Sequence, residues 1–316
     1  MLQKKIIAVV GATGAQGGGL VRAILDDPAS GYAVRVVTRE ASGPMAREFA
    51  ERGAEIAVAN LDDADSLKKA FAGAYGAFCV TFFWDHFSPD IEMAQAKSMA
   101  AAAKSCNVKH VIWSTLEDTR QWVPLEDDRM PTLQAKYKVP HLDGKADADR
   151  AFSDAGVPVT FLRTSFYWEN FIHFGMGPKP SQDGRLALTL PMGKQPLPGI
   201  AAEDIGRCAY GLFKQGTAVI GRTVAITGEN LTGAEMAAAF SAALQRDVAY
   251  CEVSPEAYRG FGFPGADELG NMFQVKRDFS TEYAGARSPK FSQSLNPKLQ
   301  DFRTWLSLNS GRIPLG

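Results

Sequence analysis

The sequence predicts an α/β fold, a doubly wound parallel sheet followed by a smaller α+β C-terminal lobe. Through the first half of the chain, short apolar runs rich in β-branched residues alternate with stretches of helical periodicity. These runs are apolar throughout rather than at every second residue, as in strands buried on both faces of a parallel sheet. The first run also passes directly into a glycine-rich turn. A length of 316 residues suits one large α/β domain with an appendage.

Strands and helices are expected in strict alternation in the first part of the chain. The strands are expected at residues 5–10, 33–38, 54–59, 77–81, 109–114 and 157–162, and the helices at 17–25, 44–52, 64–72, 89–106 and 144–155. Such strands are joined by right-handed crossovers, which place helices on both faces of the sheet. Ligands of such sheets bind at the carboxyl ends of the strands, near the switch in strand order.

The turn after the first strand predicts a dinucleotide site. It reads Gly11, Ala12, Thr13, Gly14, Ala15, Gln16 and Gly17, a GxxGxxG spacing between an apolar strand and a helix. Glycine permits positive φ, close approach of the backbone to a pyrophosphate, and tight packing of helix on strand. The free N–H groups of the first helical turn then face the anion. The alternative is an ordinary glycine-rich turn, but the flanking strand and helix favour a Rossmann-type fold.

The ends of the second and third strands bear on which dinucleotide binds. Arg39 follows the second strand, and its planar, permanently charged guanidinium suits the 2′-phosphate of NADPH. Thr38 adds a hydroxyl, whereas Glu40 would favour NADH if the register moved by one residue. The alternative interpretation makes Arg39 a solvated loop charge. Asn60 and Leu61 are candidates for the adenine edge and face, unless the aspartates after them simply cap the next helix.

The second half of the chain has a looser pattern. Residues 1–164 are expected to form the dinucleotide-binding domain, and residues 165–316 a lobe that completes the cleft without folding independently. Proline- and glycine-rich loops at 174–181 and 190–199 flank a strand at 186–190. Further helices are expected at 203–214, 232–244, 255–260, 268–277 and 299–306, and further strands at 222–227 and 248–253.

Composition argues against several classes of function. A net charge of −1 gives no electrostatic basis for binding nucleic acid. No apolar run approaches the ~20 residues of a membrane-spanning helix, and the residues before the first strand lack a signal-peptide core. The four cysteines have no CxxC spacing, which predicts packed, reduced thiols rather than disulfides or a metal site. We therefore expect a cytoplasmic protein that binds neither nucleic acid nor membrane.

Several segments resemble the NmrA-like branch of the atypical short-chain dehydrogenase/reductases, most closely its redox-sensor members. These segments are residues 11–18, 34–39, 53–56, 141–145, 167–170 and 262–266, and they span nearly the whole chain. The resemblance implies a cytoplasmic protein that binds NADPH and reports redox state through a change in conformation or association. Its expected partners are then other proteins, a second copy of this chain among them, or a small-molecule substrate if the protein is a reductase.

The resemblance also implies roles for individual residues. Gly11 to Gly17 would hold the pyrophosphate, and Arg39 would bind the 2′-phosphate. Lys145 would reach the nicotinamide ribose, and three residues after the fourth strand would lie beside the cofactor, namely Thr81, Phe82 and Phe83. The nicotinamide end would be lined by Phe166, Tyr167, Trp168 and Glu169. Two lysines common in the family are replaced, one near Gly43 and one at Ala94. Both replacements remove positive charge, which weakens the case for a strict NADP preference.

The expected catalytic centre departs from the superfamily pattern of a serine with Tyr-x-x-x-Lys, in which the lysine lowers the pKa of the tyrosine. Ser114 and Lys145 are candidates, but His141 stands at the tyrosine position. Tyr137 lies four residues earlier, and Pro140 argues against a shared helix. A histidine can still shuttle a proton near neutral pH. We expect an NADPH-binding redox sensor without turnover; the alternatives are an NADPH-dependent reductase of a quinone or other small carbonyl compound, and a purely structural protein.

An aromatic cluster follows the fourth predicted strand. It contains Phe82, Phe83, Trp84 and Phe87. Its position at the carboxyl end of a strand favours a cleft wall over a packed core. In the C-terminal lobe, Glu169 is the one carboxylate to test for a function, and the alternative is a structural role.

Overall fold

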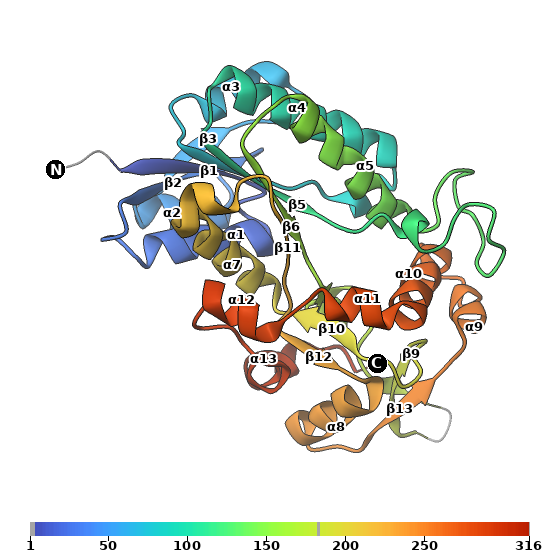
Figure 1. Ribbon diagram of the computed structural model, residues 1–316. Coiled ribbons are helices and arrows are strands. Elements are labelled where there is room, and N and C mark those ends of the chain that lie inside the picture. The colour runs from blue at the N-terminus through green and yellow to red at the C-terminus, as the bar shows by residue number, and fades with distance from the viewer. Residues whose placement is uncertain (1–3, 182–183, 316) are drawn as a thin grey trace.

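A seven-stranded parallel sheet forms the centre of the computed structural model, which describes residues 4–181 and 184–315 (Figure 1). Its strands are β1 (Lys5–Val10), β2 (Tyr32–Thr38), β3 (Glu55–Val58), β4 (Gly76–Cys79), β5 (His110–Thr115), β6 (Val159–Arg163) and β11 (Thr223–Ala225). They lie in the order β11-β6-β5-β4-β1-β2-β3, and all neighbours are parallel. The predicted doubly wound, Rossmann-type sheet is confirmed.

Helices cover both faces of this sheet (Figure 1). One face carries α3 (Ala64–Phe71), α4 (Pro89–Ser105) and α5 (Pro140–Asp154), the other carries α1 (Ala15–Leu25) and α7 (Ala202–Gln215), and α2 (Pro44–Glu51) joins β2 to β3. Each face has its own apolar core cluster. Asp63 caps α3 by accepting hydrogen bonds from the backbone N–H groups of Asp65 and Ser66, so one of the aspartates after β3 does cap the next helix.

Helices α1 and α7 pack with their backbones in contact. A Cβ atom on Gly19 would lie 2.1 Å from the carbonyl oxygen of Glu203, and one on Gly206 would lie 2.2 Å from the backbone nitrogen of Leu20. Both positions therefore require glycine, because a side chain would push the helices apart. Helix α7 thus fixes the position of α1, although it comes from the second half of the chain.

The C-terminal lobe contains two three-stranded sheets, in the orders β12-β10-β7 and β13-β9-β8 (Figure 1). The strands are β7 (Phe166–Tyr167), β8 (Lys179–Pro180), β9 (Leu186–Leu190), β10 (Leu197–Ile200), β12 (Glu229–Leu231) and β13 (Val248–Glu252). The helices are α6 (Asn170–His173), α8 (Gly233–Leu244), α9 (Pro255–Arg259), α10 (Ala266–Asp278), α11 (Ser280–Gly285), α12 (Pro289–Leu295) and α13 (Phe302–Asn309). Residues 165–316 also supply α7 and β11 to the first lobe, so the lobes interleave. That the second lobe does not fold independently stays a prediction.

Several predicted bounds were wrong. Helix α5 begins at Pro140 rather than at residue 144, because proline fits the first turn of a helix, where its missing N–H costs nothing. The last residues of the loop expected at 190–199 belong to β10, which pairs with both β7 and β12. The loop expected at 174–181 contains β8, and α11 and α12 were not predicted. These elements are too short for a periodic pattern to predict them.

The cysteines and the helix lengths bear on the remaining expectations. Cys79 and Cys208 are buried, Cys106 is half-buried and Cys251 is exposed, and all four thiols are free. Within residues 4–181 and 184–315, no group of three or more His, Cys, Asp or Glu side chains is placed to hold a metal ion. None of the helices in these ranges is long and apolar enough to cross a membrane.

Candidate functional site

The turn between β1 and α1 has the geometry of an anion cradle. Gly11 has φ +64°, which a side chain would strain. A Cβ atom on Gly17 would lie 2.3 Å from the carbonyl oxygen of Gly11, so glycine is required where the helix meets the turn. Gly14 precedes the helix with φ −88° and needs no positive φ, but it leaves the first N–H groups of α1 uncovered by a side chain. Thr13, Gly14 and Ala15 are exposed, while Ala12 is buried beneath them.

The ends of β2 and β3 lie beside this turn. Val10 pairs with Val37, so Arg39 leaves the sheet next to Gly11, and its side chain is exposed. Glu40 accepts a hydrogen bond from the Ser42 hydroxyl at 2.8 Å. The Arg39 guanidinium is therefore accessible to a phosphate, whereas the Glu40 carboxylate already has a partner.

The predicted adenine contacts follow β3. Asn60 is exposed and Leu61 is half-buried. The Asn60 side-chain oxygen accepts a hydrogen bond from the backbone N–H of Asp62 at 3.2 Å, so part of its capacity is used within the turn. These two residues stay candidates for the adenine end.

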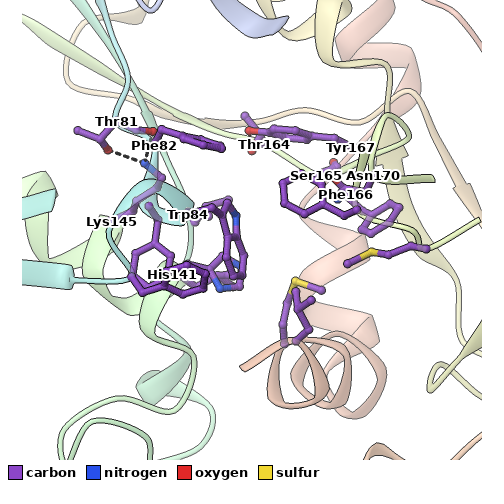
Figure 2. Close-up of a pocket in the computed structure, with 18 of the residues that line it drawn as sticks. Thr81, Phe82, Trp84, His141, Lys145, Thr164, Ser165, Phe166, Tyr167 and Asn170 are labelled. Carbon is purple, nitrogen blue, oxygen red and sulfur yellow. Dashed lines mark hydrogen bonds between the residues drawn. The ribbon is translucent and has the colours of Figure 1, made fainter. Parts of the chain in front are cut away.

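A cavity of about 300 Å³ opens beyond the end of β4 (Figure 2). Aromatic side chains dominate its lining, namely Phe82, Phe83, Trp84, Phe87, Phe166, Tyr167, Phe174 and Phe263. The aromatic cluster after the fourth strand is therefore a cleft wall, as predicted. Figure 2 shows Thr81, Lys145, Trp84 and His141 grouped on one side, with Phe166, Tyr167 and Asn170 on the other. Pockets of this size with apolar walls and a few polar groups are typical of small-molecule sites.

Lys145 projects from α5 toward the end of β4. Its ammonium donates to the Thr81 hydroxyl at 2.6 Å and to the Thr81 carbonyl oxygen at 3.1 Å (Figure 2). It also lies 2.9 Å from a carboxylate oxygen of Glu92, whose side chain is fully buried on α4. Three oxygens therefore hold this lysine at the mouth of the cavity, beside the position expected for a nicotinamide ribose. Sequence reasoning found Lys145 but not Glu92.

His141 lies one helical turn before Lys145 and faces the same cavity. Its Nδ1 is 2.7 Å from a carboxylate oxygen of Glu268, in the first turn of α10, and its ring centroid is 5.0 Å from that of Trp84. The carboxylate fixes the orientation of the imidazole and leaves Nε2 as the nitrogen available to a ligand. No sequence signal connects His141 with Glu268, because 127 positions separate them.

Ser114 does not reach this cavity. It is 2% exposed, and its hydroxyl donates to the Gln16 side-chain oxygen at 2.8 Å. The Gln16 amide in turn donates to the Tyr167 hydroxyl at 2.6 Å. Of the three candidate catalytic residues, His141 and Lys145 line the cavity together, whereas Ser114 lies behind Gln16. Burial also raises the pKa of Tyr167 to about 12, which makes this phenol a poor proton donor at neutral pH.

The segment expected at the nicotinamide end is divided between two roles. Phe166 and Tyr167 line the cavity. Trp168 is 2% exposed and packs in the core of the C-terminal lobe. The Glu169 carboxylate accepts hydrogen bonds from the backbone N–H of Ala202 at 2.8 Å and from the Trp305 indole at 3.0 Å, and burial raises its pKa. Glu169 therefore ties the start of α7 to α13, and its place at the nicotinamide end stays a prediction.

The comparisons with known proteins agree with this architecture. The "NmrA-like family domain-containing oxidoreductase FrzB" of Cladobotryum sp is 27% identical over 302 residues, which cover 88% of this chain and 85% of that protein. The "Nitrogen metabolite repression protein nmrA" of Emericella nidulans is 31% identical over 268 residues, covering 79% and 69%. The crystal structure of NmrA, a negative transcriptional regulator, in complex with NADP superimposes with a TM-score of 0.77 at 26% identity, covering 96% and 95% of the two chains. The family model described as "NmrA-like family" matches residues 3–306, and the chain belongs to this family.

Proposed function

We propose that this protein is an NADP(H)-dependent reductase of a small planar quinone or other carbonyl compound, which binds in the aromatic cavity. The observation that carries the proposal is the open, preformed cavity of about 300 Å³ with Lys145 and His141 side by side on its wall. The cavity adjoins the segment expected at the nicotinamide end, so a substrate held there would lie next to the cofactor.

The residues of the β1–α1 turn fit the dinucleotide. The uncovered N-terminus of α1 faces the position of a pyrophosphate, and a side chain at Gly17 would collide with the turn. Arg39 is exposed where a 2′-phosphate would lie, which supports NADP over NAD. The regulator of similar structure was crystallised with NAD and with NADP, which supports a nicotinamide dinucleotide without distinguishing the two. When bound, the dinucleotide supplies the hydride.

The protein's own residues then hold the reactants and move the proton. Lys145 binds the nicotinamide ribose while Thr81 and Glu92 hold its ammonium in place. His141 delivers a proton from Nε2 to the carbonyl oxygen that gains the hydride, and Glu268 positions the ring through Nδ1. The aromatic walls orient a flat substrate and exclude water.

Redox sensing is the second candidate, and two observations favour it. The superfamily tyrosine position is occupied by His141, and the Ser114 hydroxyl is engaged by Gln16. In addition, the 31%-identical relative is named as a repression protein. The protein partners that the sequence suggests belong with this candidate, whereas the cytoplasmic location and the second copy of this chain fit either candidate.

Turnover of NADPH with quinones and aldehydes separates the two. We expect steady oxidation on the order of 1 s⁻¹ or more with at least one substrate class. His141→Phe should lose turnover while keeping NADPH binding, and Lys145→Met should lose both. Lys97→Met, which removes an exposed lysine on α4, is the control and should change neither. NADPH binding without turnover across the panel would overturn the reductase and favour the sensor.

A further inference from the structure

A second lysine, Lys276, lines the cavity. Lys276 lies on α10, and Leu269 and Met272 on the same helix line the cavity with it. Its side chain comes from the interior of the C-terminal lobe and is only 4% exposed. Lysine is almost never buried to this extent without a partner, because removing an ammonium from water is costly.

The charges around Lys276 leave it without a carboxylate of its own. The carboxylate whose charge acts on Lys276 is Glu117; its Oε1 accepts a hydrogen bond of 2.6 Å from Arg287, and its Oε2 is buried without a hydrogen-bond partner. Lys276 lies 5.2 Å from the ring centroid of Tyr283 on α11, and among residues 4–181 and 184–315 it forms no ion pair. Burial, reinforced by the positive charge of Arg287, lowers the pKa of Lys276 to about 7.

We propose that the cavity binds a planar aromatic molecule carrying one anionic oxygen group, a carboxylate or a phenolate, and that Lys276 binds this oxygen. The inference rests on the proposed function and names its substrate class. The aromatic side chains hold the ring system, and Lys276 pairs with the charge. The ligand thereby supplies the counter-ion that the fold does not supply. With its charge at Lys276, the ligand directs its other end toward Lys145 and His141.

Proton uptake follows from this arrangement. Free Lys276 is largely unprotonated above neutral pH, and a bound anion favours its charged form. Of the groups that face it, Glu117 and Arg287 remain paired with each other, and burial raises the pKa of Tyr283, which stays neutral. Binding of an anionic ligand at pH 8 should therefore take up about one proton, and binding of a neutral ligand none.

The test compares two probes of the same shape, naphthalene-2-carboxylate and naphthalene-2-carboxamide. Their dissociation constants are measured by calorimetry at pH 7 and 8, in two buffers that differ in ionisation enthalpy. We expect the carboxylate to bind at least tenfold tighter than the amide, since a charge-assisted contact contributes about that factor. Lys276→Met should abolish the preference and leave amide binding unchanged. Lys290→Met, which removes an exposed lysine on α12, should keep the preference.

Equal affinity for the two probes, or a preference that survives in Lys276→Met, would overturn the proposal. If Lys276→Met does not fold, the two probes are compared on Lys276→Gln instead, and proton uptake is measured on the unmodified protein. Neither probe is reducible, so the result does not depend on turnover. A Lys276-dependent preference without NADPH oxidation would keep the anion site and reject the reductase, and turnover without the preference would do the reverse.

Discussion

The two walls of the cavity each present a lysine, and the two lysines differ in their partners. On the cofactor wall, formed by β4 and α5, Lys145 has three oxygens around it, two from Thr81 and one from Glu92. On the lobe wall, formed by α10, Lys276 has the ring of Tyr283 and no ion pair with any residue that the structure describes. One cation is fully satisfied by the fold, and the other is not.

This difference indicates different tasks. A lysine held by three oxygens keeps its position whether or not a ligand is present, which suits a group that must meet a ribose in a fixed geometry. A lysine without a counter-ion destabilises the free protein, and that cost is recovered when an anion binds. Lys145 on the cofactor wall is therefore held in place before a ligand binds. Lys276 on the lobe wall, in contrast, obtains its counter-ion from the ligand. The predictions below test each wall separately.

The largest effect is expected from Lys276→Met, measured as free energy of unfolding. In the folded protein Lys276 titrates at about pH 7, whereas in the unfolded chain it titrates near 10.5. The unfolded state therefore binds more protons between these values, and the stability of the native protein should rise with pH over this range. The variant should lack this rise and be more stable at pH 7 by roughly 3–5 kcal/mol.

Urea unfolding at pH 7 and pH 9.5 measures this difference. The gain in free energy of unfolding from Lys276→Met should shrink at the higher pH, because burying Lys276 costs less there. Lys290→Met should follow the unmodified protein at both pH values. If the free energy of unfolding changed with pH in the same way in all three proteins, Lys276 would carry no uncompensated charge.

The second effect concerns Gly14, in the turn between β1 and α1. A Cβ atom there would lie 3.2 Å from the Gly11 carbonyl oxygen, a tight contact without backbone strain. Gly14→Val should leave the fold intact but place two methyl groups over the N-terminus of α1. We expect NADPH and NADH binding to weaken by about 100-fold or more, since the pyrophosphate loses its N–H donors. Fluorescence titration measures this, and Gly14→Ala should give a smaller loss.

A folded Gly14→Val protein that binds either dinucleotide normally would move the cofactor away from this turn. Melting temperature is the control for folding. Binding of naphthalene-2-carboxylate to the same variant should be unchanged, because Lys276 lies on the lobe wall.

The third effect concerns Asp149, which lies behind Lys145 on α5. Its carboxylate accepts hydrogen bonds from Trp113 at 2.8 Å and from Thr115 at 2.6 Å, and burial raises its pKa to about 6. Between pH 3.8 and 6 the native state binds more protons than the unfolded state, so stability should fall as pH rises through this window. Asp149→Asn should remove this fall and stabilise the protein at pH 7 by about 3 kcal/mol.

Thermal unfolding at pH 4.5 and 7 tests this. Asp154→Asn removes an exposed carboxylate from the same helix and should keep the slope of the unmodified protein. An unchanged slope in Asp149→Asn would assign the pH dependence to other groups.

The smallest effect is expected from Arg39→Ala. Loss of one charge-assisted contact to the 2′-phosphate should weaken NADPH binding by about tenfold and leave NADH binding nearly unchanged. Arg47→Ala is the matched control, since it removes an exposed arginine that lies on α2. Equal losses for both dinucleotides in Arg39→Ala would reject the 2′-phosphate assignment.

The cofactor wall was largely predictable from the sequence, and the lobe wall was not. The turn from Gly11 to Gly17 and the pair His141 and Lys145 follow from local spacing, because the strand, turn and helix that position them are contiguous in the chain. Even there, the start of α5 predicted from the sequence was wrong, and the position of Ser114 behind Gln16 was not predicted. That hydrogen bond joins residues 98 positions apart.

The residues that distinguish the site come from long-range packing. Glu268 and Lys276 fall within a predicted helix, where an acidic residue in the first turn and a lysine in the last are usually explained by the helix dipole and by solvent. Only the packing of α10 against α5 and α11 makes Glu268 the partner of His141 and buries Lys276. The sequence favoured a sensor because it shows the missing tyrosine but not the cavity.

The close packing of α1 against α7 has a consequence for how this family can diversify. Since Gly19 and Gly206 bring the two backbones into contact, a fragment ending at residue 164 would leave that face of α1 uncovered and would lack β11 at the sheet edge. We therefore expect that the C-terminal lobe cannot be exchanged as a unit between related proteins. We expect ligand preference to have diverged by point substitution and loop-length change within one chain, and chimeras joined at residue 164 to aggregate unless α7 and β11 come from the same parent as α1.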